Sequence, residues 1–458
     1  MRYAAVLHKN PIQHIAKGAL NKAPLQYLVS DADKAVHRVF KYTVRPHVIK
    51  LANQEHSGRC WIFSFTNMMR RKMIQKYNLP PTFKLSQKYI MFFDRLEKCN
   101  AFMEVMYFLN KKKGVKMYSF EMTYIRQSYM SDGGTWSFFK DLVLKYGVVP
   151  YDQYPDNVQA KNSAQIGKLL WEHVNSYGIR ISKTKTRAEF EKIKREALVS
   201  CYSIIEMFLG KPPSSFVWEY TTKDEKYRTS RKALTPSTFY QQYIRNLVNV
   251  DDYVALINDP RRAYDKIYSV ELLHNVLPPT KVPLDRLPSN IYLNVPIDTL
   301  RDATYNSIRK NMSVPFAGDV SYFMHDQVDD ALIDTNDHYQ ALLGVQLVRP
   351  RKFLFDNMLS SPNHAMLIIG CNGARGDWEV ENSWKQSNQD YQYLTMTDDW
   401  FEYYVGEVIV HKRVLSHKLR ALYTRLMRAP DKITYYPYWD IFGSVANMRR
   451  AVMQAGAK

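Results

Sequence analysis

The stretch Gln54-Glu-His-Ser-Gly-Arg-Cys60-Trp61 decides how this chain is interpreted. After it, apolar residues recur at three- and four-residue spacing, which predicts a helix that begins at Cys60. A helix N-terminus stabilises a thiolate, so Cys60 is a candidate nucleophile. Gly58 lets the backbone approach a substrate closely, and the Gln54 amide can donate to an oxyanion beside the Cys60 amide.

A cysteine nucleophile needs a base, and the base needs an orienting group. His364 opens a hydrophobic strand pattern, and Asn382 closes the next one. The Asn382 oxygen can accept from one imidazole nitrogen while the other faces the thiol, and the indole of Trp384 can shield that bond from water. The structural alternative stays open at this point, because most helical cysteines and most strand-initial histidines are parts of a core.

These residues resemble those of the papain-like cysteine peptidases, including the six-residue step from Gln54 to Cys60. His364 follows Cys60 by 304 residues instead of the usual ~130–150, which implies an insertion of roughly 150 residues. That excess resembles the bleomycin hydrolases and their bacterial aminopeptidase relatives. Further strings fall in this family's order over roughly residues 30–445: Asp132-Gly133-Gly134-Thr135-Trp136, Lys145–Pro150, Phe216–Tyr220, Thr235-Pro236, Asn258–Arg261 and Met396–Phe401.

The resemblance implies a role for each residue of the site. Cys60 would be the nucleophile, His364 the general base and then acid, and Asn382 the orienting residue, with Gln54 as oxyanion donor and Trp384 as cleft support. The implied activity is that of a cysteine aminopeptidase, which hydrolyses peptide substrates through an acyl-enzyme without a cofactor or a metal. Members of the family assemble as hexamers, and their C-terminal arm limits the cleft to a substrate's N-terminal residue.

The predicted fold class is α+β: a papain-like, two-lobed cysteine peptidase with a helical lobe, a β-barrel-like lobe and a large, mainly helical insertion. Helices are predicted over 87–96, 137–146 and 187–208, and strands over 365–371, 378–381, 393–396 and 404–410. The expected domains are an N-terminal arm (1–50), the helical lobe with the nucleophile (51–159), the insertion (160–330), the strand-rich lobe with His and Asn (331–415), and a C-terminal arm with a basic extension (416–458).

Composition limits the setting of the protein. Of 458 residues 46% are hydrophobic and 24% charged, as in globular proteins, and no apolar run approaches the ~18 residues that cross a bilayer. Four cysteines without a Cys-x-x-Cys pair exclude a zinc ribbon and favour a reducing compartment, so we expect a cytoplasmic protein without membrane contact. The acid-free, basic segment before Asp31 leaves organellar import open. We expect structural roles for Cys99, Cys201 and Cys371.

Departures from the family pattern support a second hypothesis. Lys385 stands where the family usually has Gly, the segment 314–319 lacks the usual Trp and Cys, and residues 447–458 extend the tail. The tail is expected either to be trimmed by the enzyme itself near Ala446 or to abolish aminopeptidase activity. With a formal charge of +20, the alternative is a repurposed, weakly active or inactive ring or scaffold protein with affinity for nucleic acid.

Overall fold

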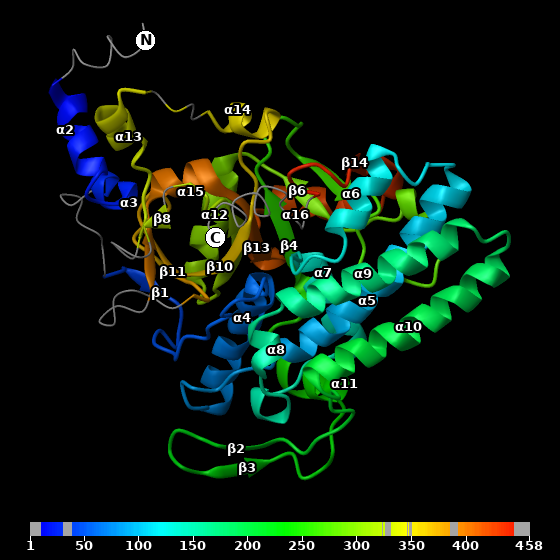
Figure 1. The fold of residues 1–458 in the computed structure, drawn as a ribbon. Coiled ribbons are helices and arrows are strands. Elements are labelled where there is room, and N and C mark those ends of the chain that lie inside the picture. The colour runs from blue at the N-terminus through cyan, green and yellow to red at the C-terminus, as the bar shows by residue number, and fades with distance from the viewer. Residues whose placement is uncertain are drawn as a thin grey trace, which may run out of the picture.

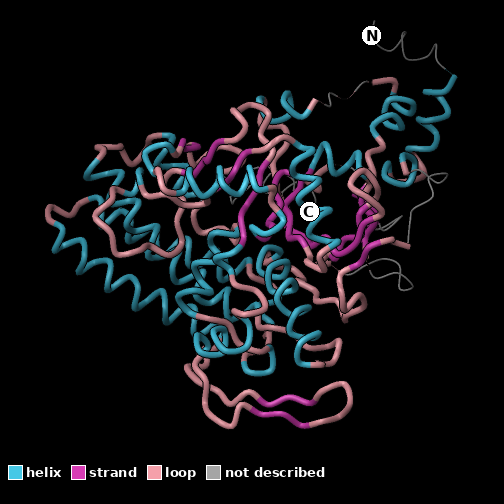
Figure 2. Tube along the Cα trace, turned by 180° about the vertical axis from the view of Figure 1, so that it is seen from behind, coloured by secondary structure: helices cyan, strands magenta, loops and turns pink. Residues whose placement is uncertain are grey.

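A helix-rich side and a strand-rich side make up the chain in a computed structural model, which describes residues 11–30, 39–322, 324–325, 331–345, 347, 350–384 and 393–443 (Figures 1 and 2). The long helices α5, α9 and α10 pack against one another on the first side. The helices are α2 (Pro11–Leu20), α3 (Leu25–Val29), α4 (Cys60–Tyr77), α5 (Gln87–Tyr107), α6 (Phe120–Ser128), α7 (Trp136–Tyr146), α8 (Val158–Lys161), α9 (Ala164–Ser182), α10 (Arg187–Leu209), α11 (Pro236–Phe239), α12 (Ile297–Arg309), α13 (Asn336–Leu343), α14 (Arg351–Asp356), α15 (Asp398–Tyr404) and α16 (His417–Met427).

The strand-rich side is one large mixed sheet, in which the described residues form twelve strands in the order β14-β5-β6-β4-β13-β7-β10-β11-β12-β9-β8, with β1 also paired to β10. A separate hairpin, β2–β3, projects from the helical side (Figure 1). The strands are β1 (Tyr42–Thr43), β2 (Glu219–Thr221), β3 (Tyr227–Thr229), β4 (Tyr253–Ile257), β5 (Lys266–Val270), β6 (Tyr292–Asn294), β7 (Val314–Gly318), β8 (Met324–His325), β9 (Ala331–Leu332), β10 (His364–Cys371), β11 (Trp378–Glu381), β12 (Leu394–Met396), β13 (Val405–His411) and β14 (Thr434–Tyr436).

The predicted start of a helix at Cys60 is confirmed, and α4 lies between the two sides of the molecule. It ends at Tyr77 because Asn78 adopts the left-handed conformation (φ 51°) and donates its backbone N–H to the Ile74 carbonyl. The helix contacts α5 and α7 on one side and β10 and β7 on the other. Because α4 is packed against helices on one side and strands on the other, most of it is buried and it has more than one apolar face.

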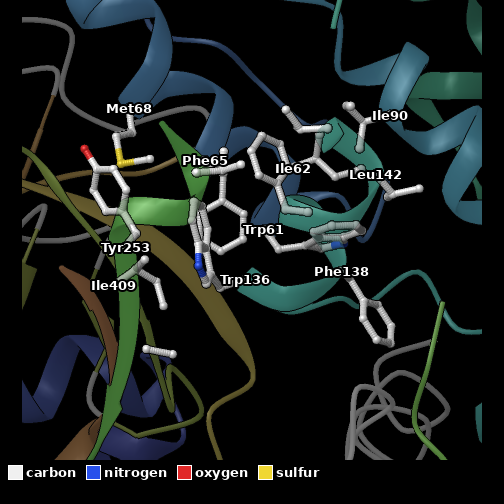
Figure 3. Packing of buried hydrophobic residues seen from close by; sticks show 14 of the residues in the cluster. Trp61, Ile62, Phe65, Met68, Ile90, Trp136, Phe138, Leu142, Tyr253 and Ile409 are labelled. Carbon is white, nitrogen blue, oxygen red and sulfur yellow. The ribbon is translucent and has the colours of Figure 1, made fainter. Parts of the chain in front are cut away.

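One apolar core joins the helices to the sheet (Figure 3). Phe65 of α4 packs edge-on against Trp136 of α7, with ring centroids 5.0 Å apart. Trp136 in turn contacts Tyr253 of β4, at 5.7 Å between centroids. Because these rings bridge the two sides, the helix that carries Cys60 cannot shift without disturbing the sheet.

Two polar contacts fix the position of α4 against the sheet. The Ser64 hydroxyl donates to the Met366 carbonyl on β10 at 2.6 Å. Nearer the other end of the helix, Arg71 donates to Glu381 of β11 through Nε at 3.0 Å, and neither side chain is exposed to solvent. Glu381 directly precedes Asn382, so this ion pair ties the helix to the strand that presents the predicted orienting residue.

The α+β class predicted from the sequence is confirmed, but the expectation of a mainly helical segment over 160–330 is wrong for residues 253–318. The first part holds α9 and α10, as expected, whereas the later part contributes β4, β5, β6 and β7 to the main sheet. These strands are short and almost wholly buried, and periodicity cannot separate such runs from buried helix. The expected boundary at residue 330 therefore cuts through the strand-rich side.

Most other predicted elements are confirmed with small shifts at their ends. The helix predicted over 87–96 continues to Tyr107, and the one over 187–208 ends at Leu209. The strands predicted near 365, 378, 393 and 404 are present as β10 to β13. None of the helices within the described ranges has the length and apolar character needed to span a membrane.

Replacing Glu381 by Leu is expected to destabilise the fold by about 3–5 kcal/mol, because it leaves the Arg71 guanidinium buried without its counter-charge. The double variant Arg71→Met/Glu381→Leu should recover most of that loss, since it removes both charges. Urea denaturation of the three proteins measures the difference. A single variant as stable as the wild type would show that the pair does not hold α4 to β11.

Candidate active site

A cavity of about 680 Å³ lies where the helical side meets the sheet, and it brings together most of the residues singled out from the sequence. Gln54, Cys60, His364 and Trp384 all line it. Asn382 stands behind His364 and is hydrogen-bonded to it. Residues separated by about 300 positions in the chain therefore share one cleft.

Cys60 is the first residue of α4 and is 6% exposed at the cleft. The preceding Arg59 does not cap the helix with its side chain. Its guanidinium instead makes a two-pronged ion pair with Asp156, at 2.8 and 3.1 Å, and donates to the Ser57 hydroxyl at 2.8 Å. The dipole of α4, whose positive end lies at this terminus, favours negative charge on the Cys60 sulfur.

The loop from Met130 to Gly134 also lines the cleft, and its contacts with the Cys60 segment leave no room for a side chain at Gly58 or Gly134. A Cβ on Gly58 would lie 2.4 Å from the Asp132 side chain, and one on Gly134 would lie 2.4 Å from the Trp61 ring. The Trp61 indole N–H donates to the Asp132 carbonyl at 2.9 Å. The Asp132-Gly133-Gly134 string therefore packs directly against the segment that carries Cys60.

Sheet register explains why His364 and Asn382 meet. Strands β10 and β11 are antiparallel with Leu367 opposite Glu381, so continuing this register sets His364 opposite Trp384 and diagonal to Asn382 on one face. The His364 Nε2 atom lies 2.8 Å from the Asn382 Oδ1 atom. That oxygen also accepts the Ser383 backbone N–H at 2.8 Å, which fixes the orientation of the amide. Nε2 must then carry the proton, and Nδ1 is the nitrogen available as a base.

Trp384 covers this hydrogen bond. Its ring stacks on the imidazole of His364, with centroids 4.1 Å apart and an interplanar angle of 29°. Both His364 and Asn382 are about 98–99% shielded from solvent, at 2% and 1% exposure. A hydrogen bond in so dry a setting holds the imidazole more firmly than one open to water.

Gln54 connects the turn that precedes Cys60 to the residues that follow strand β11. Its Nε2 donates to the Ser57 carbonyl at 2.5 Å, its Oε1 accepts from the Ser383 hydroxyl at 2.6 Å, and its backbone N–H donates to the Ser383 carbonyl. An amide nitrogen has two hydrogens, so one remains for a ligand in the cleft. The same contacts hold the 54–58 turn against the residue that follows Asn382.

One cleft residue, Glu407 on β13, was not singled out from the sequence. It lines the cavity, and burial raises the pKa of its carboxyl to about 8. The Oε1 atom has no hydrogen-bond partner among the residues that the structure describes. The signal was a single acidic residue within the apolar run 405–410, but without the sheet nothing showed which way it faced.

Neither a metal nor a second reactive thiol is indicated by the described ranges. They contain no group of three or more His, Cys, Asp or Glu side chains arranged to hold a metal ion. A hydrogen bond with Cys201 and burial raise the pKa of Cys99, and burial raises the pKa of Cys371 to about 12. All three of these cysteines are buried, which favours the structural roles expected for them.

Replacing Glu407 by Gln should stabilise the protein more at pH 8.5 than at pH 5. The folded carboxyl keeps its proton up to a pKa of about 8, whereas the unfolded one loses it near 4.5, so wild-type stability falls as pH rises between these values. Burial, and then the charge of Glu407, also raise the pKa of the neighbouring Tyr292. Melting temperatures of both proteins at the two pH values measure the effect.

The control for this comparison is Glu172→Gln, which changes a carboxyl that is 51% exposed on helix α9. Its melting temperature should track that of the wild type at both pH values. If the difference between Glu407→Gln and the wild type were the same at pH 5 and pH 8.5, Glu407 would not be a buried, uncompensated acid.

Comparison with known proteins identifies relatives of the whole chain. The model of the Peptidase C1-like family matches residues 1–443. Human bleomycin hydrolase is 30% identical over 423 residues, covering 89% of each chain, and aminopeptidase C of Listeria innocua is 29% identical over 452 residues, covering 97% of this chain and 94% of its own. Aminopeptidase E of Lactobacillus helveticus is 30% identical over 448 residues, covering 96% of this chain and 97% of its own.

A solved structure is similar to this chain over almost its whole length. The crystal structure of PepW from Lactobacillus rhamnosis superposes with a TM-score of 0.84 at 26% identity, covering 97% of both chains. This similarity confirms the papain-like fold predicted from the sequence. The chain belongs to the Peptidase C1-like family, and with its bleomycin hydrolase and aminopeptidase relatives it is a papain-like cysteine aminopeptidase.

Proposed function

We propose that the enzyme releases a substrate's N-terminal residue through an acyl-enzyme on Cys60, with His364 as general base and then acid, and Asn382 as the residue that orients it. One observation carries this proposal: the hydrogen bond from His364 to Asn382 fixes an imidazole on the wall of the cleft that Cys60 also lines. A nucleophile, its base and an orienting acceptor are the parts that this chemistry needs.

The reaction divides into two displacements at one carbonyl carbon. The Cys60 thiolate attacks the carbonyl, and the resulting oxyanion accepts from the Cys60 backbone N–H and the remaining amide hydrogen of Gln54. Protonated His364 gives its proton to the leaving amine as the C–N bond breaks and a thioester forms. His364 then takes a proton from the water that attacks the thioester, and the C–S bond breaks to release the amino acid. The Cys60 thiolate and protonated His364 are thereby restored.

The C-terminal segment is proposed to limit the length of substrate that fits the cleft, so that only the N-terminal residue of a peptide enters. Ile441 and Phe442 line the cavity, and the preceding Asp440 is held by Arg261 at 2.9 Å. These two side chains take up part of the cleft, which favours a substrate whose N-terminus lies inside it over one whose chain continues past it. The expected trimming near Ala446, the extension after it and Lys385 all lie outside the described residues.

Two observations argue against the repurposed-scaffold alternative. Gln54, Cys60, His364 and Trp384 line one cleft, with Asn382 hydrogen-bonded to His364, and the named relatives are peptidases. One motivation for it was the altered segment 314–319, whose residues 314–318 form strand β7 beside β10. The hexameric assembly, the cytoplasmic location and contact with nucleic acid stay predictions from the sequence.

Replacing Cys60 by Ala should lower the rate of amine release from a leucyl fluorogenic amide by at least about 10⁴-fold, because no thioester can form. Replacing Asn382 by Ala should lower kcat by about 100-fold, with a smaller change in KM, because the imidazole loses its orientation. Steady-state kinetics with purified proteins measure both effects.

The matched control is Asn357→Ala, which changes an exposed asparagine at the end of α14 and should leave both constants near the wild-type values. Equal rates for the wild type and Cys60→Ala would overturn the proposed mechanism. A loss in Asn382→Ala that appeared only in KM would assign that residue to substrate binding instead of orientation.

A further inference from the structure

The three carboxylates that line the cleft differ in their ion-pair and hydrogen-bond partners and in their exposure to water. Of the described residues that line it, Glu55, Asp132 and Glu407 are acidic. Asp132 forms an ion pair with Arg95 and accepts from the Gly58 backbone N–H at 3.0 Å. Glu55 is exposed at the rim, where water solvates it. Glu407 is buried, and the structure gives its Oε1 atom no partner among the described residues.

Sheet register places Glu407 at the back of a small hollow. It pairs with Ala317 of β7, which pairs in turn with Ala365 of β10, so the three side chains form one row on the same face. Ala317 and Ala365 are each the one residue of their strand that is not buried. Two methyl side chains therefore leave open space beside a carboxylate, one residue along β10 from His364.

The chemistry of this hollow selects a cation. A buried carboxylate without a counter-charge is costly, and an ammonium ion that enters offsets the cost through a charge-assisted hydrogen bond. Among the described residues that line the cleft there is no Lys or Arg to supply such a cation. Tyr292, which also lines the cleft, is an acid, and burial and then the Glu407 charge raise its pKa. The raised pKa of Glu407 has the same origin, namely burial that nothing in the described structure compensates.

We propose that Glu407 is a specificity-determining residue that binds an ammonium group of the substrate's N-terminal residue. The inference rests on the proposed function, since it assigns a role to a second group in the same cleft. The ammonium has two sources, the free α-amino group or the side chain of an N-terminal lysine, and the experiment separates them.

The test compares four fluorogenic amides, those of leucine, lysine, N-acetyl-leucine and N-acetyl-lysine, with the wild type and Glu407→Gln. If the α-ammonium binds Glu407, the wild type prefers leucine to N-acetyl-leucine in kcat/KM, and Glu407→Gln reduces that preference by at least 10-fold. If the lysine ammonium binds there, the variant instead reduces the preference for lysine over leucine by at least 10-fold. Either result supports an ammonium site.

Two further variants separate binding from a structural effect. Glu407→Asp keeps the charge and should retain part of the preference. Glu271→Gln removes another part-buried carboxyl of raised pKa, outside the cleft lining, and should leave all four rates unchanged. A loss of the same factor for all four amides in Glu407→Gln, or no loss for any, would overturn the inference.

The outcome is distinguishable from failure of the proposed function. If hydrolysis depends on Cys60 while Glu407→Gln keeps the wild-type order of substrates, the mechanism stands and the ammonium site is wrong. If Cys60→Ala hydrolyses the four amides as fast as the wild type, the mechanism itself is wrong, and the selectivity of Glu407→Gln would then belong to another reaction.

Discussion

The site depends on how helix α4 is held against strands β10 and β11. Its sulfur and its imidazole come from residues 304 positions apart, so only tertiary contacts can bring them to one cleft. Ser64 reaches the Met366 carbonyl one turn after Cys60 and two residues after His364. A helix rises 1.5 Å per residue and a strand about 3.3 Å, so this bond lies roughly 6 Å from each of the two positions along its own element. Of the contacts that hold α4 against the sheet, this buried hydrogen bond lies nearest to both groups and helps to set their spacing.

Within the cleft, a chain of hydrogen bonds that is shielded from water fixes the orientation of the His364 imidazole. The Ser383 amide fixes Asn382, Asn382 fixes the tautomer of His364, and Trp384 covers the resulting bond. Glu407 is the exception, since its carboxylate is buried without a described partner. Groups that are left uncompensated in a folded protein often mark the place where a ligand supplies the missing interaction.

Much of this arrangement could be predicted from the sequence, for physical reasons that differ by element. The start of α4 follows from polar turn residues before a three- and four-residue apolar repeat, and β10 follows from a branched apolar run after Pro362-Asn363. The strands within 253–318 were not found, because a buried run such as Tyr253–Ile257 has no alternation to separate it from a helix. Glu407 could not be predicted, because only the strand register shows that this acidic residue lies beside Ala317 and lines the cleft.

The most direct test of the account is the rate at which iodoacetamide alkylates Cys60 at pH 6, in the wild type and in His364→Ala. Because Cys99, Cys201 and Cys371 are 0% exposed, whereas Cys60 is 6% exposed and lines the cleft, the fast reaction reports Cys60 alone. If His364 holds the sulfur ionised, His364→Ala reacts at least about 100-fold more slowly than the wild type. The reason is that only ~0.3% of an ordinary thiol is ionised at that pH. Equal rates in the two proteins would contradict the account, because the thiolate would then owe nothing to the imidazole.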